Sequence, residues 1–248
     1  LMSRYPVEVQ LLAITHPTPT FIQRLPSLEG LGSLPERLLE HAGRLCTNTV
    51  DKEGSNPEFL PARVKEGHES LIEHVSLTFY IRASRVLTHE LVRHRIASYS
   101  QRSQRYVKEK EPKYITPPEF SHPILPRGKY WTDEMLRQDR WASRFEHAMK
   151  VAWEEYLALI ENGVPRELAR YVLPNACETQ IIMTMNLRSL RNFIRQRTAK
   201  RALPEMQQVA REILGYCLQI APSVFRDLRY LLEPCCGYNG KCCRDTTN

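Results

Sequence analysis

The chain has 248 residues, 42% of them hydrophobic and 25% charged, which is the composition of an ordinary soluble globular protein with a sizeable core. Seven cysteines, four of them crowded near the C-terminus, do not form the pattern of a secreted disulfide framework. No signal peptide or long apolar run is present, so we expect a cytoplasmic protein with no membrane partner. The net charge of +7 favours acidic ligands such as nucleic acid or phosphorylated small molecules.

The N-terminal third of the chain predicts a strand followed by two helices. PVEVQLLAIT, residues 6–15, has the alternation of β-branched and apolar residues that favours a strand. Residues 27–50 are typical of a helix with Pro35 in its first turn, and a second helix begins near Pro57. EGHES, residues 66–70, then predicts a turn.

An amphipathic strand and a helix come next. In VSLTFYIRAS, residues 75–84, every second residue is apolar, which predicts a half-buried strand. Its apolar face consists of Val75, Leu77, Phe79 and Ile81. A helix follows, with Ser84 as its candidate N-cap. Residues 93–106 therefore belong to the end of this helix and to the loop after it.

The remaining chain predicts four helices and a strand. Residues 107–128 are rich in proline and lysine and predict an irregular segment. The predicted helices cover residues 132–162, 164–174, 187–198 and 204–222, and ETQIIMTMN between the second and third favours a strand. In the third helix, Leu187, Leu190 and Ile194 point inward and the arginines outward. We expect one α+β domain over residues 1–232 and a cysteine-rich tail over 233–248.

Common phosphate-binding and zinc-binding motifs are absent. Neither G-x-G-x-x-G nor G-x-x-x-x-G-K-S/T occurs, which argues against a Rossmann dinucleotide site and a P-loop. His68 and His74 are six residues apart and His89 and His94 are five apart, whereas the helical zinc motif needs a spacing of four. Neither pair is therefore interpreted as a zinc site.

The cysteines show no catalytic pattern. Cys177 has no base placed beside it in the sequence, so we interpret it as a buried structural thiol rather than a nucleophile. The closing CCGYNGKCC could bind zinc or an iron–sulfur centre, could oxidise, or could be a disordered tail, and these alternatives stay open. Its cysteines, which we place outside the main activity, are Cys235, Cys236, Cys242 and Cys243.

Residues 93–106, RHRIASYSQRSQRY, form the most distinctive segment. Guanidinium groups lie there among serine hydroxyls and glutamine amides, with no acidic residue between them. Arginine binds phosphate oxygens in pairs, hydroxyl groups complete the shell, and amides match the donors and acceptors of a nucleobase. The pattern alone leaves three alternatives: a solvated basic face, a nucleic-acid-binding surface, or a mononucleotide site.

Four segments, in the same order along the chain, resemble the flavin-dependent thymidylate synthases. RHR at residues 93–95, followed after seven residues by Ser103, matches that family's RHR-x7-S signature, and Arg105 stands two residues past the serine as it does in the family. HESLIEHVSLTFYI, GVPRELARYVLP and MNLRSLRNFIRQR resemble three further family segments. Together the four are distributed across most of residues 65–232, which makes the resemblance specific.

The resemblance implies a fold, a reaction and a set of ligands. The implied fold is α+β, a twisted and mainly antiparallel sheet packed with helices, in a homotetramer whose active sites lie at subunit interfaces. FAD is the implied cofactor, and dUMP, 5,10-methylenetetrahydrofolate and NADPH are the implied substrates. The expected reaction transfers the folate's methylene group to C5 of dUMP. Reduced FAD supplies the hydride, NADPH reduces the flavin again, and dTMP is the product; no nucleic-acid polymer is expected as a partner.

The resemblance also implies ligand-binding residues. For dUMP they are Glu90, Leu91, Val92, Arg93, Gln101, Arg102, Ser103, Gln104, Arg105, Arg170 and Arg197. For FAD they are Ser70, Arg93, His94, Arg95, Gln101, Asn186, Leu187, Arg188 and Asn192, with His68 as a secondary candidate. Arg197 is the expected catalytic residue. A fixed guanidinium beside N3 of the uracil stabilises negative charge on the ring and makes C5 nucleophilic without covalent attack at C6.

One departure from the family and two rival functions are relevant. Arg201 occupies a position where many members carry a histidine near the flavin. A nucleic-acid-binding protein that uses residues 93–105 would bind polymers in a salt-sensitive way, but it would have no use for the other three segments. A flavin-binding homologue without turnover would keep the fold, but the intact Ser103, Arg105 and Arg197 argue against it.

Overall fold

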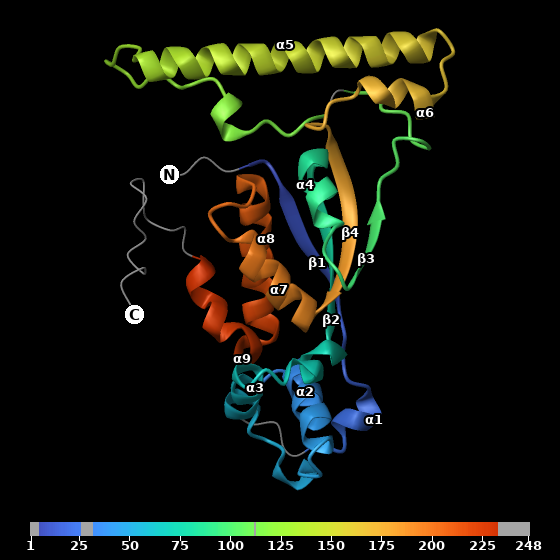
Figure 1. Ribbon diagram of the computed structural model, residues 1–248, viewed down its shortest axis with the longest axis vertical. Coiled ribbons are helices and arrows are strands. Elements are labelled where there is room, and N and C mark those ends of the chain that lie inside the picture. The colour runs from blue at the N-terminus through green and yellow to red at the C-terminus, as the bar shows by residue number, and fades with distance from the viewer. Residues whose placement is uncertain (1–4, 26–31, 112, 233–248) are drawn as a thin grey trace. The chain divides into compact units, whose positions relative to one another are not determined.

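The computed structural model describes residues 5–25, 32–111 and 113–232, and it confirms the predicted α+β class (Figure 1). In this part of the chain, four strands form one open antiparallel sheet in the order β1-β2-β4-β3. The strands are β1 (Glu8–Ile14), β2 (Ser76–Ser84), β3 (Ala97–Gln101) and β4 (Glu178–Asn186). The four terminal cysteines lie outside the described residues, so the alternatives for the tail stay open.

Helices make up most of the remaining regular structure. The α-helices of the described part are α1 (Pro19–Ile22), α2 (Leu34–Leu45), α3 (Asn56–Lys65), α4 (Arg85–Leu91), α5 (Asp133–Glu161), α6 (Arg166–Ala169), α7 (Leu187–Arg197), α8 (Pro204–Ile220) and α9 (Pro222–Phe225). Short 3-10 helices include η2 (Glu69–His74), η3 (Pro118–Phe120), η4 (Arg170–Val172) and η5 (Arg226–Leu232). Across the ranges that the structure covers, none of these helices combines the length and the apolar character needed to cross a membrane.

The two central strands carry the buried face of the sheet. The predicted apolar face of residues 75–84 is confirmed, because Val75, Leu77, Phe79 and Ile81 are all fully buried. On β4, Ile181, Met183 and Met185 are buried in the same alternating pattern. Strands with this strict period of two are the ones that a sequence predicts well.

Strand β3 corrects the prediction that the chain after α4 is a loop. ASYSQ pairs with β4 at the edge of the sheet. The amide of Arg102 then extends the contact to the carbonyl of Gln180 at 2.9 Å. Because an edge strand with polar side chains lacks alternating apolar residues, its sequence does not indicate a strand.

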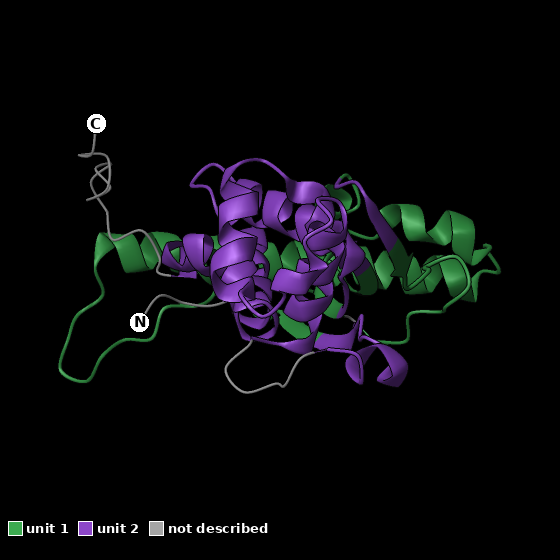
Figure 2. Cartoon of the chain, turned by 90° about the horizontal axis from the view of Figure 1, so that it is seen from below, with its two compact units in different colours: residues 1–10, 80–93, 99–183 green, residues 11–79, 94–98, 184–248 purple. Residues whose placement is uncertain are grey.

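The chain falls into two compact units (Figure 2). Unit 1 holds the chain up to Gln10, Tyr80–Arg93 and Tyr99–Met183, and unit 2 holds Leu11–Phe79, His94–Ser98 and the chain from Thr184 onward. The boundaries pass through all four strands, so each strand contributes to both units. The expectation of a single domain over residues 1–232 stays a prediction.

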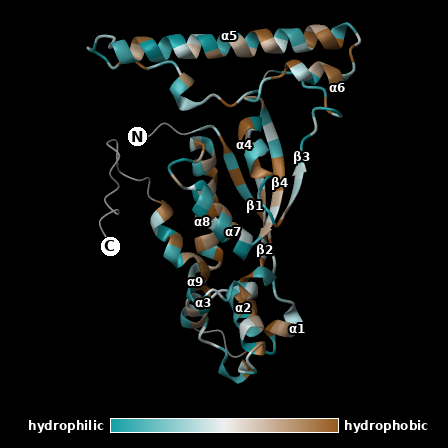
Figure 3. Cartoon of the chain, in the orientation of Figure 1, coloured by the Kyte–Doolittle hydropathy of each residue, from teal (hydrophilic) through white to brown (hydrophobic). Residues whose placement is uncertain are grey.

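Helix α5 is the longest element of unit 1. It begins where the side chain of Thr132 accepts a hydrogen bond from the amide of Met135, and it ends before Gly163, whose φ of 81° no other residue type adopts easily. Both ends match the prediction. Figure 3 shows hydrophilic and hydrophobic residues interleaved along the helix. Its buried residues are Ala142, Met149, Trp153 and Tyr156.

Helix α7 in unit 2 follows its predicted inward face, and its predicted outward face has one exception. Leu187, Leu190 and Ile194 are fully buried, as expected. The prediction that the arginines point outward is wrong for Arg191, which is only 1% exposed. Its guanidinium donates to both carboxylate oxygens of Asp227, at 2.8 and 2.7 Å, and this pairing makes burial of the charge tolerable.

Candidate active site

A cleft in unit 2 gathers four of the residues implied for FAD. Its volume is about 350 Å³. The lining residues are Glu69, Glu73, Arg95, Ile96, Asn186, Arg188, Ser189, Asn192 and Arg195. Asn186 is the N-cap of α7, with its side-chain oxygen accepting from the amide of Ser189 at 2.8 Å. The cleft therefore begins at the positive N-terminal end of an 11-residue helix, which is a favourable place for an anion, and it continues along the helix to Arg195.

Arginines of α7 and carboxylates of η2 set the charge of this cleft. Arg188 donates to Glu73 at 2.5 Å. The distances from Glu69 carboxylate oxygens are 3.5 Å to Arg188, 3.9 Å to Arg191 and 3.9 Å to Arg195. The lining residues include three guanidiniums, those of Arg95, Arg188 and Arg195, and two carboxylates, so the cleft keeps a net positive charge. The carboxylates also hold the arginines of α7 in place.

The other residues implied for FAD do not line the cleft, and three of them lie on or near η2 and α7. The side chain of Leu187 is fully buried, and its amide donates to the carbonyl of Val75 at 3.0 Å. Ser70 on η2 is exposed. His68, the secondary candidate, is exposed just before η2 and lies 3.8 Å from a carboxylate oxygen of Glu66.

His94 and Arg197 lie in direct contact in unit 2. The Nε of Arg197 donates a hydrogen bond to Nε2 of His94 at 2.7 Å. His94 is 7% exposed, and its ring packs edge-on against Phe193. Burial first, and then the charge of Arg197, lower the pKa of His94 to about 4. The imidazole is therefore neutral at pH 7 and can accept the hydrogen bond.

In unit 1, the last residue of β3 and the residues after it are held by side-chain hydrogen bonds. The side-chain nitrogen of Gln101 donates to the hydroxyl oxygens of Thr88 at 3.0 Å and Thr179 at 3.2 Å. The hydroxyl of Ser103 accepts from the amide of Arg105 at 3.1 Å. Gln104 is buried. The serine and the guanidinium predicted for the dUMP phosphate thus belong to one locally folded turn.

This turn is joined to α6. Arg105 donates to Glu167 at 3.0 Å, and Arg166 donates to the carbonyl of Tyr106 at 2.9 Å. Arg170, which the resemblance implies for dUMP, begins η4 directly after α6 and is half-buried. The structure therefore connects two of the recognised segments within unit 1.

The end of α4 contains the remaining dUMP candidates. Leu91 is fully buried, and its carbonyl accepts a hydrogen bond from the hydroxyl of Tyr99 at 2.8 Å. Glu90 and Val92 are half-buried, and Arg93 is exposed. Because the Leu91 side chain lies in the core, only its backbone is left to meet a ligand.

Comparison with known proteins identifies the family to which the chain is similar. Residues 32–223 match the family described as thymidylate synthase complementing protein. A flavin-dependent thymidylate synthase from Clostridium tetani is 41% identical over 225 residues, covering 84% of this chain and 86% of the relative. The corresponding protein of Geobacter sulfurreducens is 41% identical over 202 residues, covering 78% and 82%. One from Mycobacterium tuberculosis is 37% identical over 201 residues, covering 77% and 78%.

The chain belongs to the flavin-dependent thymidylate synthase family. The resemblance to this family is thereby confirmed, and the chain is an enzyme that converts dUMP to dTMP with FAD as its cofactor. Its one-carbon donor is 5,10-methylenetetrahydrofolate, which is part of the family reaction.

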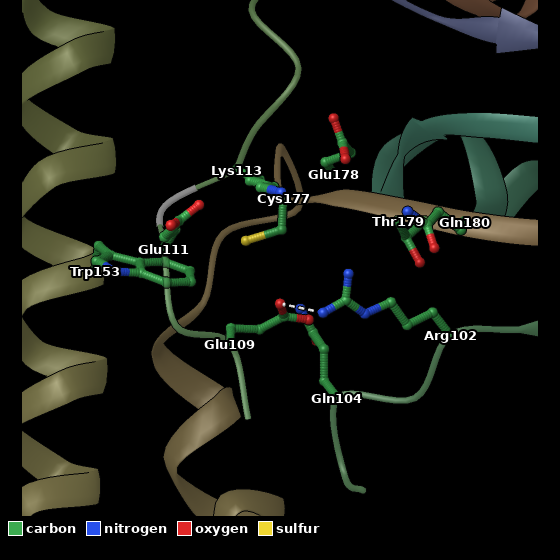
Figure 4. Close-up of a pocket in the computed structure, with 10 residues that line it drawn as sticks. All are labelled: Arg102, Gln104, Glu109, Glu111, Lys113, Trp153, Cys177, Glu178, Thr179 and Gln180. Carbon is green, nitrogen blue, oxygen red and sulfur yellow. Dashed lines mark hydrogen bonds and ion pairs between the residues drawn. The ribbon is translucent and has the colours of Figure 1, made fainter. Parts of the chain in front are cut away.

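Cys177 is buried in this flavin-dependent thymidylate synthase, as expected for a structural thiol. Burial raises the pKa of the Cys177 thiol to about 11, with only partial opposition from the charge of Arg85. Figure 4 shows the thiol beside a small cavity in unit 1, near Trp153, with Arg102 reaching toward Glu109. At about 10 Å³ this cavity barely admits one water molecule, so it offers no room for a substrate.

The sequence did not reveal the supporting partners of the site. Glu69, Glu73 and Arg195 of the cleft, and Glu167 beside Arg105, were not singled out. Glu69 precedes the serine of the HESLIEH segment, Glu73 is the second glutamate of that segment, and Glu167 lies inside GVPRELARYVLP. Their position in recognised segments could have indicated a role at the site. Their contacts with arginines more than 60 residues away could not be predicted from the sequence.

Proposed function

We propose that this flavin-dependent thymidylate synthase binds part of FAD in the cleft of unit 2. The observation that carries the proposal is the gathering of Arg95, Asn186, Arg188 and Asn192 around one cleft of about 350 Å³. This volume is at the lower end for ligand pockets and suits a portion of a dinucleotide. Guanidinium and amide donors at a helix N-terminus fit phosphate oxygens, so the residues present fit the cofactor.

The cofactor and the side chains of the protein have different roles in the reaction. When bound, the flavin supplies the hydride that completes the new methyl group. Arg188 is held by Glu73, and Asn192 lies one turn further along α7. These two side chains bind the cofactor and orient it. Holding reacting groups at the correct distance and angle is a large part of an enzyme's rate enhancement.

We assign the phosphate of dUMP to Ser103 and Arg105 in unit 1, with backbone amides of Arg102 and Gln104 and the guanidinium of Arg170. Support comes from the hydroxyl and guanidinium of one turn, joined to α6 through Glu167. Arg105 is exposed, so a phosphate can reach it without opening the core. A doubly charged phosphate also competes well with a single exposed carboxylate for a guanidinium.

Arg197 is the residue that we assign to the uracil ring. Its guanidinium would stabilise negative charge at N3 and the adjoining carbonyl, which makes C5 the nucleophile. Support comes from its fixed position at the end of α7 and from its partial burial, which strengthens its field at a neighbouring ring.

The proposal extends to NADPH as the reductant, to a homotetramer and to a cytoplasmic location. Exposed apolar side chains of unit 1 support association with further subunits. They include Ile124, Tyr130, Trp131, Trp141 and Tyr171. The three cysteines within the described ranges are free thiols, which supports a reducing compartment. Light scattering of the purified protein measures the assembly directly.

Replacement of Arg188 tests the cofactor site. We expect Arg188→Ala to raise the dissociation constant of FAD by roughly tenfold or more, because a charge-assisted contact with the cofactor is lost. Quenching of flavin fluorescence during titration of the apoprotein measures this constant. Arg144→Ala, at an exposed position of α5, is the matched control and should bind FAD as the wild type does.

Two outcomes would contradict the proposal. Unchanged FAD affinity in the Arg188 variant would remove the cleft from consideration. A wild-type protein that stays colourless after incubation with FAD, and instead binds nucleic acid in a salt-sensitive way, would favour the rival function of residues 93–105.

A further inference from the structure

Two signature segments meet in unit 2 through a side-chain hydrogen bond. Arg197, the last residue of α7, and His94, from the RHR segment, are 103 residues apart in sequence. Their side chains are joined from Nε to Nε2 at 2.7 Å. The His94 ring is also held by Phe193, one turn earlier on α7, with 5.0 Å between ring centroids and an interplanar angle of 86°.

We propose that His94 is a positioning residue, whose Nε2 holds the guanidinium of Arg197 in the orientation that serves the uracil. The inference rests on the proposed function of Arg197 and deepens it. It differs from the resemblance, which implies His94 as a contact of the flavin. A ring that is 7% exposed, packed on Phe193 and engaged by Arg197 is better placed to support a side chain than to line a cofactor.

Arginine needs such support to act on a substrate ring. Its long side chain loses considerable rotamer entropy when it is fixed, and an unfixed guanidinium samples many orientations. A hydrogen bond at Nε sets the plane of the group, because Nε and the two terminal nitrogens are coplanar. A partner that packs against the same helix therefore pre-orients the guanidinium before dUMP arrives.

The hydrogen bond has a definite protonation requirement. Nε2 can accept only if the imidazole is neutral and carries its proton on Nδ1. The charged group facing His94 from α7 is Arg197, and its sequence neighbours Arg93 and Arg95 are also cations. All of them disfavour an imidazolium, as does burial, and the pKa of about 4 agrees with a neutral ring.

Three substitutions separate positioning from packing. His94→Gln places an acceptor oxygen near the position of Nε2, whereas His94→Asn places it near Nδ1, out of reach of Arg197. His94→Phe keeps an aromatic ring against Phe193 but has no acceptor. We expect the glutamine variant to keep kcat within about threefold of wild type, and the asparagine and phenylalanine variants to lose roughly ten- to a hundredfold.

A double-mutant cycle shows whether His94 acts through Arg197. We expect His94→Phe to cost no further activity in an Arg197→Ala background, because the side chain that it positions is already absent. The dissociation constant of FAD, measured by fluorescence, should stay within about twofold of wild type in every His94 variant. His147→Gln, at an exposed position of α5, controls for histidine replacement as such.

Distinct results would overturn the inference. Equal activity of the glutamine and asparagine variants, full activity of the phenylalanine variant, or additive losses in the cycle would each show that His94 does not act through Arg197. A large loss of FAD affinity would return His94 to the flavin. If Arg197→Ala alone keeps wild-type turnover, the proposed function of Arg197 fails instead, and thermal melting of each variant separates these outcomes from misfolding.

Discussion

At position 94, burial decides the charge of a side chain. The unfolded chain exposes this imidazole to water, where its pKa is about 6.5. In the folded protein, removal from water and the charge of Arg197 lower the pKa to about 4. Between about pH 4 and pH 6.5, the imidazole of His94 therefore binds a proton in the unfolded chain but not in the folded protein.

We therefore expect the protein to lose stability as the pH falls from about 6.5 toward about 4. Proton uptake by the unfolded chain lowers the free energy of unfolding within this window, and the contribution is fully present above pH 6.5. The loss at pH 4.5 should be about 2–3 kcal/mol. Urea denaturation at pH 7 and pH 4.5 measures it.

The variant His94→Gln supplies the comparison, because other groups also titrate in this range. Its amide cannot take up a proton, so its loss of stability between pH 7 and pH 4.5 should be smaller than that of the wild type by about the same 2–3 kcal/mol. Equal losses in the two proteins would contradict the assignment of a lowered pKa to His94.

At the scale of elements, α7 is fixed by the contact of Arg191 with the end of the chain that the structure describes. The guanidinium pairs with Asp227 on η5 and also donates to the carbonyl of Val224. Because α7 carries Arg188, Asn192 and Arg197, its placement in unit 2 decides where these side chains lie. A structural ion pair thus supports the candidate site without touching a ligand.

Removal of the carboxylate should destabilise unit 2. We expect Asp227→Ala to lower the free energy of unfolding by about 2–4 kcal/mol, because the buried charge of Arg191 loses its bidentate partner and keeps, within the described part of the chain, only the carboxylate of Glu69, 3.9 Å away. The matched control is Arg137→Ala, which removes an exposed i,i+3 pair with Glu134 and should cost less than about 0.5 kcal/mol. Denaturant titrations of the two variants measure both values, and similar small losses would show that the Arg191 pair is unimportant.

Elements with a strong period were predictable, whereas those set by partners were not. The buried alternation of β2, the inward leucines of α7 and the capped ends of α5 follow from local sequence, and all are confirmed. Strand β3 was missed because its edge position leaves its side chains polar. The burial of the Arg191 side chain depends on Asp227, 36 residues later in the sequence. Local sequence patterns do not predict a contact between residues so far apart.

At the scale of the whole molecule, each unit contains a coherent part of the candidate site. Unit 2 contains the cleft with Arg188 and Asn192, and unit 1 contains Ser103 and Arg105. The sequence identified these residues through segments shared with a family, because a ligand constrains residue types as strongly as a core does. It could not identify the hydrogen bond from Arg197 to His94, which depends on the tertiary fold alone.

The most direct test of the account is the formation of dTMP by the purified protein supplied with dUMP, 5,10-methylenetetrahydrofolate, NADPH and FAD. The account predicts dTMP in the complete mixture, none when FAD is omitted from the apoprotein, and a loss of roughly a hundredfold or more in Arg197→Ala. FAD-loaded protein that binds dUMP but forms no dTMP would contradict it.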